Sequence, residues 1–463
     1  MGAYPCSIYK ISVQVRLLGS LLAGIKYGIG VLEMESGKKL ILYRDFALGK
    51  VFYDFTWMMD YNASIDSNKE EIQSLCYEGI HELIELSASH GFEGNLWQNY
   101  LTFLLVNHEN AYSTSCEIKG AVQGSINELA LHDFSVLKEL FDFDFGELQE
   151  KLEVPELAIL KDYKRTDRGG KVFNHRIRDR ICALSVRLRQ TETVEEFKDE
   201  VTEFYREFGV GKLGLHKAFR VEHERDKVKI VPITNIAHVH LDDLVGYEDA
   251  KQKLIDNTEA FVSGKQANNC LLFGDAGTGK STSIKAIINQ YYEKGLRMIE
   301  IYKHQFQDLN DVIGQIKNRN YKFIIYMDDL SFEEFEIEYK YLKAVIEGGL
   351  EKKPDNVLIY ATSNRRHLVR EKFSDKAERD DELHTNDTVQ EKISLVSRFG
   401  VTIYFGKPDK KEFQEIVRNL AKRQKIQMEE EELLAEANKW ELSHGGLSGR
   451  TAQQFINYLL GKQ

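Results

Sequence analysis

The chain has 463 residues, of which 42% are hydrophobic and 5 are proline, so it is long enough for two or three domains with sizeable cores. Its net charge of -11 argues against a protein built chiefly to coat nucleic acid. The five cysteines lack the close spacing of a disulfide framework or a CxxC metal site, so a reducing cytoplasm is the expected setting.

The apolar stretch "LLGSLLAGI" (17–25) lies near the N-terminus and is flanked by Arg16 and Lys26. It is shorter than the ~20 residues that a membrane span needs, so we expect a buried helix. The opening "MGAYPC" has Cys6 where a myristoylation signal has Ser or Thr, and no positively charged leader precedes the apolar stretch. We therefore expect no export signal, lipid anchor or membrane contact.

Residues 1–225 predict a mainly helical N-terminal region. The clearest helix is "TETVEEFKDEVTEFYREFG" (191–209), whose apolar residues recur at three- and four-residue steps. Thr193 and Glu196 form a capping box at its start, and Gly209 ends it. A helical region of this kind is a candidate for partner binding.

One basic segment stands out within this region. Residues 161–189 contain ten Lys or Arg and three Asp, a balance that could contact a phosphate backbone. The charges alternate with apolar residues at helical spacing, which is more typical of solvated helix faces in an acidic protein. Nucleic acid binding stays open but is not favoured.

Residues 226–245 predict a linker, and residues 246–406 predict an α/β domain. Five short apolar runs alternate with helical segments in this domain, which indicates a parallel sheet of five strands. The runs are "NCLLF", "RMIEIY", "FIIYM", "VLIYAT" and "VTIYF".

The loop after the first run has the pattern GxxxxGK[ST] between a strand and a helix, as a phosphate-binding loop requires. Its glycines let backbone N–H groups turn toward phosphates, the helix N-terminus favours negative charge, Lys280 neutralises phosphate, and Ser281 is a ligand for Mg2+. We therefore predict ATP and Mg2+ as ligands. The nucleotide-binding residues of this loop are Gly274, Asp275, Ala276, Gly277, Thr278, Gly279, Lys280, Ser281 and Thr282.

An acidic pair ends the third run, in "KFIIYMDDLSFEE". We expect Asp328 to hold Mg2+ through water, because Mg2+ uses few protein ligands, and Asp329 to orient or deprotonate the attacking water. The alternative is that the pair only caps the next helix.

The order of these motifs, followed by "SRFG" and a C-terminal helical segment with "SGR", resembles an AAA+ ATPase. The segments "LDDLVGYEDAKQKL", "DDLSFEE", "ATSNRRHL" and "SLVSRFG" resemble a narrower bacterial AAA+ family catalogued as a domain of unknown function, number 815. The resemblance covers residue 241 to the C-terminus. It implies a P-loop NTPase core with a helical lid at residues 407–463, but names no client.

The resemblance also implies roles for three polar residues outside the loop. Asn364 matches the residue that orients the lytic water, and Arg398 matches the arginine presented to a neighbouring subunit's γ-phosphate, so the protein should be a homo-oligomer such as a hexameric ring. Arg450 matches the lid arginine that senses the γ-phosphate within its own subunit. Ser448 is a plausible N-cap, which places Arg450 in a first helical turn where a cation needs a nearby anion. The alternatives are that Asn364 only forms a turn and that Arg450 is an ordinary surface residue.

The segment Val245, Gly246 and Tyr247 matches the part of similar proteins that lines the adenine pocket. By itself, this segment indicates only a turn between the linker and a helix.

Two features depart from the AAA+ pattern. Asp329 stands where most of these enzymes have Glu, so hydrolysis is expected to be slow. Helicase-loader and replication-initiator relatives also have an Asp pair at this place. The segment "YKHQFQDLND" lacks the aromatic-apolar-Gly loop of protein-threading unfoldases, for which Phe306 is a weak substitute. The charged residues 371–388 are expected to form a mobile loop.

The sequence therefore predicts a cytoplasmic, Mg-dependent AAA+ ATPase that acts as an oligomer on an unknown protein partner. Two alternatives remain open: a helicase-loader-like ATPase acting on DNA, and a nucleotide-gated scaffold with little hydrolysis.

Overall fold

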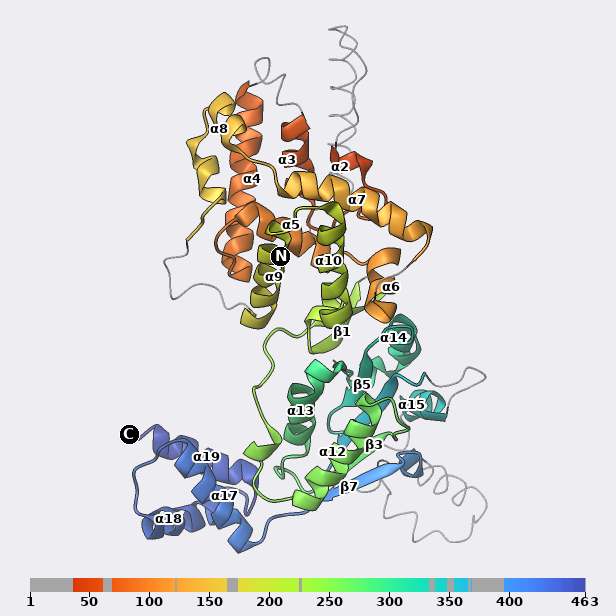
Figure 1. Cartoon of the computed structure of the whole chain (residues 1–463). Helices are drawn as coiled ribbons and strands as arrows, with labels where there is room; N and C mark the ends of the chain where they lie inside the picture. The colour runs from red at the N-terminus through yellow and green to blue at the C-terminus, as the bar shows by residue number, and fades with distance from the viewer. Residues whose placement is uncertain are drawn as a thin grey trace. The chain divides into compact units, whose positions relative to one another are not determined.

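The computed structural model describes residues 36–60, 69–120, 123–164, 174–224, 227–332, 338–347, 354–364, 368 and 395–462. The chain divides into two compact units, residues 1–211 and 212–463 (Figure 1). The predicted helix at residues 17–25 and the predicted loop at 371–388 lie outside the described residues.

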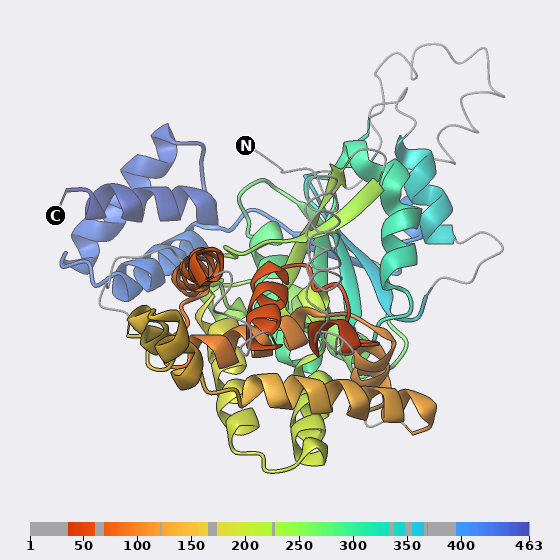
Figure 2. The same ribbon diagram turned by 90° about the horizontal axis from the view of Figure 1, so that it is seen from above.

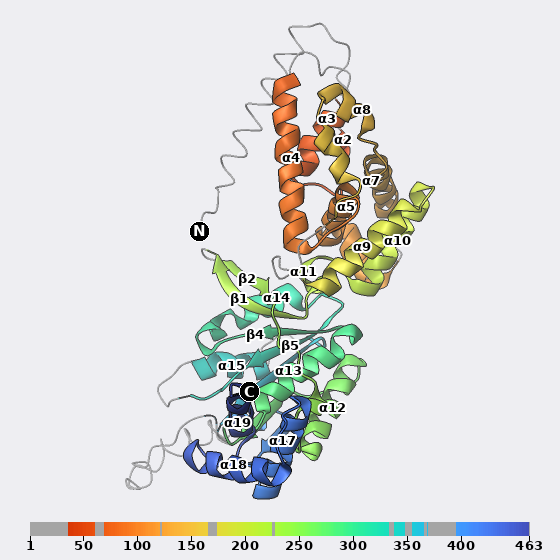
Figure 3. The same cartoon turned by 90° about the vertical axis from the view of Figure 1, so that its left-hand side faces the viewer.

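The described part of the first unit is helical, as predicted (Figures 1 and 3). Its elements are α2 (Ser36–Lys39), α3 (Lys50–Asp60), α4 (Lys69–His90), α5 (Leu96–Asn107), α6 (Ala111–Lys119), α7 (Ser125–Phe141), α8 (Gly146–Leu152), the 3-10 helix η2 (Pro155–Leu160), α9 (His175–Arg189) and α10 (Val194–Phe208); α11 (Gly211–Leu215) follows.

Sequence signals of helix ends appear in this unit as expected. Thr193 caps α10, its side chain accepts a hydrogen bond from the Glu196 amide, and Gly209 follows the last turn with a positive φ. This confirms the predicted capping box and helix end.

In the basic segment, Arg187 of α9 forms an ion pair with Glu200 of α10, and Arg178 pairs with Asp179. Some of the predicted basic face is therefore engaged by acidic neighbours.

Asp133 of α7 holds the segment after α2 in place although its carboxylate is buried. Its oxygens accept hydrogen bonds from the backbone N–H groups of Ile41, Leu42 and Tyr43 at 2.7–3.0 Å. Such bonds compensate the loss of hydration that burial of a carboxylate entails.

The second unit contains a seven-stranded sheet in the order β2-β1-β4-β5-β6-β3-β7. The strands are β1 (Ala218–Glu224), β2 (Lys227–Pro232), β3 (Cys270–Gly274), β4 (Leu296–Glu300), β5 (Lys322–Met327), β6 (Val357–Ser363) and β7 (Val401–Phe405). All neighbours pair in parallel except β1 and β2, which form an antiparallel hairpin at one edge (Figure 3).

The five predicted strands are therefore present as β3 to β7, and the predicted α/β class is confirmed. The sheet differs from the prediction in its two additional strands, and the residues 226–245 that the sequence assigned to a linker include β2. The reason is that β2 is an edge strand whose side chains are mostly exposed or half-buried, so its charged sequence does not show the apolar run of a central strand.

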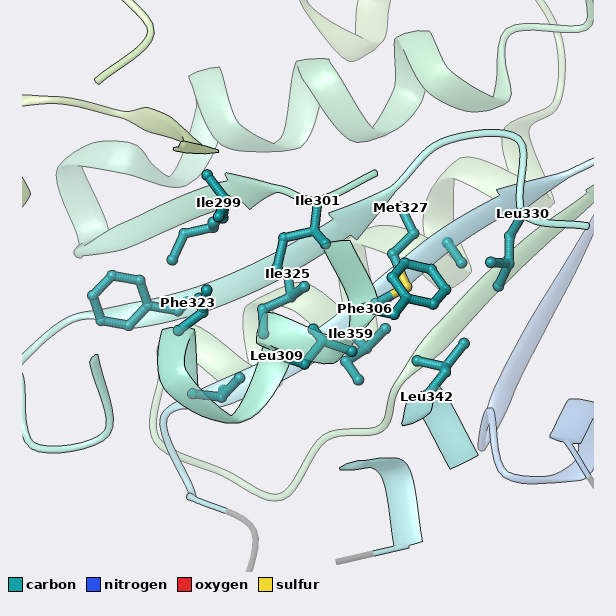
Figure 4. Close-up of a cluster of buried hydrophobic side chains, with 14 of the residues drawn as sticks. Ile299, Ile301, Phe306, Leu309, Phe323, Ile325, Met327, Leu330, Leu342 and Ile359 are labelled. Atoms are coloured by element: carbon teal, nitrogen blue, oxygen red, sulfur yellow. The ribbon is translucent and has the colours of Figure 1, made fainter. Parts of the chain in front are cut away.

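Helices cover both faces of this sheet. One face packs against α12 (Glu248–Val262) and α13 (Lys280–Tyr291), and the other against η5 (Lys303–Asp308), α14 (Leu309–Ile316) and α15 (Glu338–Glu347). Alternate residues of β5 serve the two cores: Phe323, Ile325 and Met327 face α14 and α15, as Figure 4 shows for the labelled side chains. Phe306, which the sequence offered as a weak pore-loop residue, is buried in this core.

The C-terminal helices α17 (Lys410–Arg423), α18 (Glu430–Ser443) and α19 (Gly449–Leu460) pack together around their own small core, coloured blue in Figure 2. Two 3-10 helices complete the described elements of this unit, η3 (Leu241–Asp243) and η4 (Tyr292–Lys294). None of the helices in the described part of the chain has the length and apolar composition that a membrane crossing requires.

Candidate nucleotide-binding site

The loop between β3 and α13 requires glycine at several positions. A Cβ on Gly274 would lie 2.1 Å from the carbonyl oxygen of Phe405, and one on Gly279 would lie 2.3 Å from a Leu244 methyl group. Both residues also have positive φ, at 137° and 95°. Only glycine fits such positions, so the loop can expose its backbone N–H groups beside the N-terminus of α13.

Lys280 is the first residue of α13, and its ammonium group lies inside the loop. Its Nζ donates to the carbonyl oxygens of Gly274 and Asp275 at 2.9 and 2.6 Å and to Oδ1 of Asn364 at 3.0 Å. Burial lowers the pKa of Lys280, while Asp275, Asp329 and Asp328 oppose that shift. A bound phosphate would oppose it in the same way.

Ser281 lies one residue further along α13 and contacts the end of β5. Its hydroxyl donates to Oδ1 of Asp328 at 2.6 Å, and the hydroxyl of Thr362 donates to the same oxygen at 2.6 Å. Burial by itself would raise the pKa of Asp328, but the hydrogen bonds from Ser281 and Thr362, together with Tyr326 and the charge of Lys285, outweigh burial, so the pKa lies below its ordinary value of 3.8. Asp328 is therefore ionised across the physiological range.

Asp329 lies next to Asn364 at the carboxyl ends of β5 and β6. The Asn364 Nδ2 donates to Asp329 Oδ1 at 2.7 Å, while its Oδ1 accepts from Lys280. Asp329 has a φ of 50°, in the left-handed region that few non-glycine residues adopt. One amide side chain thus links the loop lysine to the acidic residue that the sequence proposed as the base.

The remaining residues of the predicted loop lie around this network. Thr278 donates from its hydroxyl to the carbonyl oxygen of Asp275 at 2.8 Å. The Asp275 carboxylate accepts from the backbone N–H of Lys407 at 3.1 Å. Ala276 and Thr282 are in the same segment, on the loop and on α13.

The N-terminus of α19 contacts the phosphate loop. Ser448 is its N-cap, as predicted, and accepts a hydrogen bond from the Thr451 amide at 3.1 Å. The backbone N–H of Arg450 donates to the carbonyl oxygen of Gly277 at 3.2 Å, and the Arg450 side chain is exposed. The structure therefore brings Arg450 beside the loop, and its charge contributes to lowering the Lys280 pKa.

A cleft of about 500 Å³ lies between the segment that precedes α12 and the first lid helix, α17. Val245 and Gly246 line one side of it, and the α17 residues Lys411, Glu412, Gln414, Glu415 and Arg418 line the other. The expected adenine segment thus borders a cleft. Tyr247 is not one of these lining residues: its ring packs against Phe405 and its hydroxyl donates to the Gly406 carbonyl at 2.9 Å, so it anchors the segment to the core.

Arg398 is not part of this network. It precedes β7, at the end of the sheet opposite the phosphate loop, and forms an ion pair with Glu347 of α15. The five residues of β7 separate the two ends by about 16 Å, at roughly 3.3 Å per residue, which exceeds the reach of an arginine side chain. Arg365, Arg366 and His367 lie outside the described residues.

The described residues fit a nucleotide with Mg2+. The loop has positions where only glycine leaves room, an ammonium group inside it, and a hydroxyl paired with an ionised carboxylate, Ser281 and Asp328. Mg2+ at phosphate sites takes one or two protein ligands and keeps several waters. Accordingly, no cluster of three or more His, Cys, Asp or Glu side chains is required, and none occurs among the described residues.

Thr362 is the site residue that sequence reasoning missed. Thr362 lies near the end of β6, two positions before Asn364, which directly follows the strand, and the two-residue spacing is that of side chains on one face of a strand. That alternation, in the motif "ATSN", was the available signal.

Residues 214–463, more than half of the chain, match the model of the family described as "Protein of unknown function (DUF815)". The chain belongs to this family. In the second unit of this DUF815 protein, the strand that carries the phosphate loop, β3, lies between β6 and β7.

Several solved structures are similar to part of the DUF815 chain. A mutant of RuvB from Thermotoga maritima is 19% identical with a TM-score of 0.33, over 47% of this chain and 64% of that chain. The RuvB Holliday junction branch migration motor of that organism is 16% identical with a TM-score of 0.30, and the match covers 47% of this chain and 71% of that chain. The FIGL-1 AAA domain in complex with ADP is 17% identical with a TM-score of 0.33, and the match covers 49% of this chain and 74% of that chain.

The match thus spans less than two thirds of the first of these structures. A search among curated proteins gave no match.

Proposed function

We propose that this protein binds and hydrolyses Mg-ATP, and that the site is built from the phosphate loop, the acidic pair and Asn364. The observation that carries the proposal is the hydrogen-bonded connection from Lys280 through Asn364 to Asp329, beside the Ser281–Asp328 pair. The cation and the two acids that phosphoryl transfer to water needs are therefore adjacent.

In this proposal each residue has a separate role. Lys280 and the loop N–H groups bind the β- and γ-phosphates, and Ser281 and Asp328 hold Mg2+, which neutralises charge on the phosphates. Asp329 accepts the proton of the attacking water, which Asn364 helps to orient. Lys280 exchanges its carbonyl partners for phosphate oxygens when ATP binds.

The site is proposed to be completed by two arginines. Arg450 at the start of α19 reads the γ-phosphate within its own chain, which couples the lid to the presence of that phosphate. Arg398 acts on the site of a neighbouring subunit, because it lies too far from the loop of its own chain along β7. The functional form is then a homo-oligomer that couples ATP hydrolysis to a change in an unidentified protein partner, with the helical region at residues 1–225 as the recruiting part.

An Asp329→Asn variant tests the chemistry. It should bind ATP as the parent does, because the loop and Asp328 are intact, and should lose about 10²–10⁴-fold in hydrolysis rate, the usual contribution of a general base. Equilibrium binding of ATP and steady-state phosphate release are the measurements. Lys280→Ala should instead lose binding, and Asp311→Asn, an exposed position on α14, is the matched control.

Hydrolysis by Asp329→Asn at the parent rate would show that Asp329 is not the base. Phosphate release that stays negligible at every protein concentration, with ATP still bound, would favour the nucleotide-gated scaffold. Binding of DNA that weakens steeply with salt would favour the helicase-loader-like alternative.

A further inference from the structure

We infer that Thr362 is a positioning residue of this site, whose single hydroxyl sets both the Mg2+ carboxylate of Asp328 and the backbone of Asp329. The inference rests on the proposed function. It concerns a residue that acts through its two acidic neighbours.

The hydrogen bonds of Thr362 have a determined direction. Its Oγ1 lies 2.6 Å from Asp328 Oδ1 and 2.9 Å from the backbone nitrogen of Asp329. The Asp329 amide can only donate, so the hydroxyl proton of Thr362 is directed to the ionised Asp328. A hydroxyl is the group that can donate to one neighbour and accept from the other at the same atom.

The Asp328 carboxylate is oriented by this contact. The hydroxyls of Ser281 and Thr362 both donate to Oδ1, so neither of them engages Oδ2. Ser281 is itself a proposed metal ligand and would change its hydrogen bonds when Mg2+ binds. Thr362 is 2% exposed and lies on β6, an interior strand between β5 and β3, so its hydroxyl can hold Asp328 both with and without Mg2+.

The Asp329 backbone depends on the same side chain. Its φ of 50° is unfavourable for a residue with a Cβ, and such conformations persist where neighbouring groups hold them. The Thr362 hydroxyl holds the Asp329 amide, and the Thr362 carbonyl accepts from the Leu330 amide at 2.7 Å. Without the hydroxyl, Asp329 can rotate away from Asn364 while Leu330 remains attached.

A series of substitutions separates this role from plain packing. Thr362→Val keeps the shape and the backbone bond to Leu330 but removes the hydroxyl. Thr362→Ser and Thr362→Ala both lose the methyl group and differ only in the hydroxyl. If the valine variant does not fold, a comparison of these two variants tests the role of the hydroxyl. Thr258→Val, a fully buried threonine of α12, is the matched control for loss of a core hydroxyl.

The measurements are ATP binding with and without Mg2+ and the Mg2+ concentration for half-maximal ATPase activity. Thr362→Val and Thr362→Ala should bind metal-free ATP like the parent and need about 10- to 100-fold more Mg2+, the usual effect of removing a group that orients a metal ligand. Thr362→Ser should resemble the parent.

A parent-like Mg2+ dependence in folded Thr362→Val or Thr362→Ala would overturn this inference and leave the proposed function standing. The same holds if Thr258→Val shifts the Mg2+ dependence equally. Failure of the parent itself to bind ATP would overturn the proposed function and this inference with it.

Discussion

The Asn364 amide donates a 2.7 Å hydrogen bond to the carboxylate of Asp329, which joins the ends of β6 and β5 at the phosphate loop. The Oδ1 atom of the same side chain accepts a hydrogen bond from Lys280. A phosphate that draws Lys280 away from Asn364 would therefore also affect the hydrogen bond between Asn364 and Asp329. This relationship connects the lysine proposed to bind phosphate with the acid proposed to activate water.

Arg450→Ala should reduce the preference of the protein for ATP over ADP. The Arg450 backbone is held at the phosphate loop by Gly277, so the side chain starts within the region where a γ-phosphate would be read. Loss of one charge-assisted hydrogen bond should weaken ATP binding by about 1.5–3 kcal/mol and leave ADP nearly unchanged. Competition titrations with both nucleotides measure this, and equal discrimination in parent and variant would make Arg450 a surface residue.

Arg398→Ala should still bind ATP, but its rate of hydrolysis should fall by ~10³-fold, which is the contribution of an arginine finger in related chemistry. Mixing it with Lys280→Ala should partly restore activity, because mixed oligomers contain interfaces with an intact loop and an intact finger. Arg398 is paired with Glu347 in the single chain, so Glu347→Gln serves as a control for loss of that ion pair. No recovery in oligomers shown to be mixed would rule out a shared site.

Arg297→Met should destabilise residues 212–463 by about 2–3 kcal/mol. Arg297 is 3% exposed, donates to the carbonyl oxygens of Leu213 and Gly214, and lies over the rings of Tyr292 and Tyr321. The substitution leaves those carbonyl oxygens without this donor. Urea unfolding followed by hydrogen exchange in this unit measures the loss, and Arg220→Met, an exposed arginine of β1, should have little effect.

The N-terminal unit should lose stability as pH falls below neutrality. Burial lowers the pKa of His90 and of His108 from 6.5. A group whose pKa is lower in the folded state contributes stability above its unfolded value, and that contribution is lost as pH falls through the folded value. Thermal unfolding from about pH 7.5 to 5.5 should show this slope. Replacing both residues by Gln should flatten the slope, and His81→Gln, exposed on α4, should not.

The sequence by itself determined the features that depend on local chemistry. The glycines and Lys280 of the phosphate loop, the apolar runs of β3 to β7 and the capping box of α10 are readable because each is set by neighbours a few residues away. The strands β1 and β2 were less readable. β2 is an edge strand, which needs little apolar surface, and β1 lies between β2 and β4, a strand from a distant part of the chain.

Only the tertiary structure decided which side chains meet. Thr362 reaches Asp328 across 34 residues of chain, and Lys280 reaches Asn364 across 84, because β5, β6 and β3 end side by side in a parallel sheet. The same packing turned Tyr247 toward Phe405 rather than into the cleft and put Arg398 at the far end of β7. A sequence pattern records the residue types along the chain, whereas strand order and register decide which of them share a hydrogen bond.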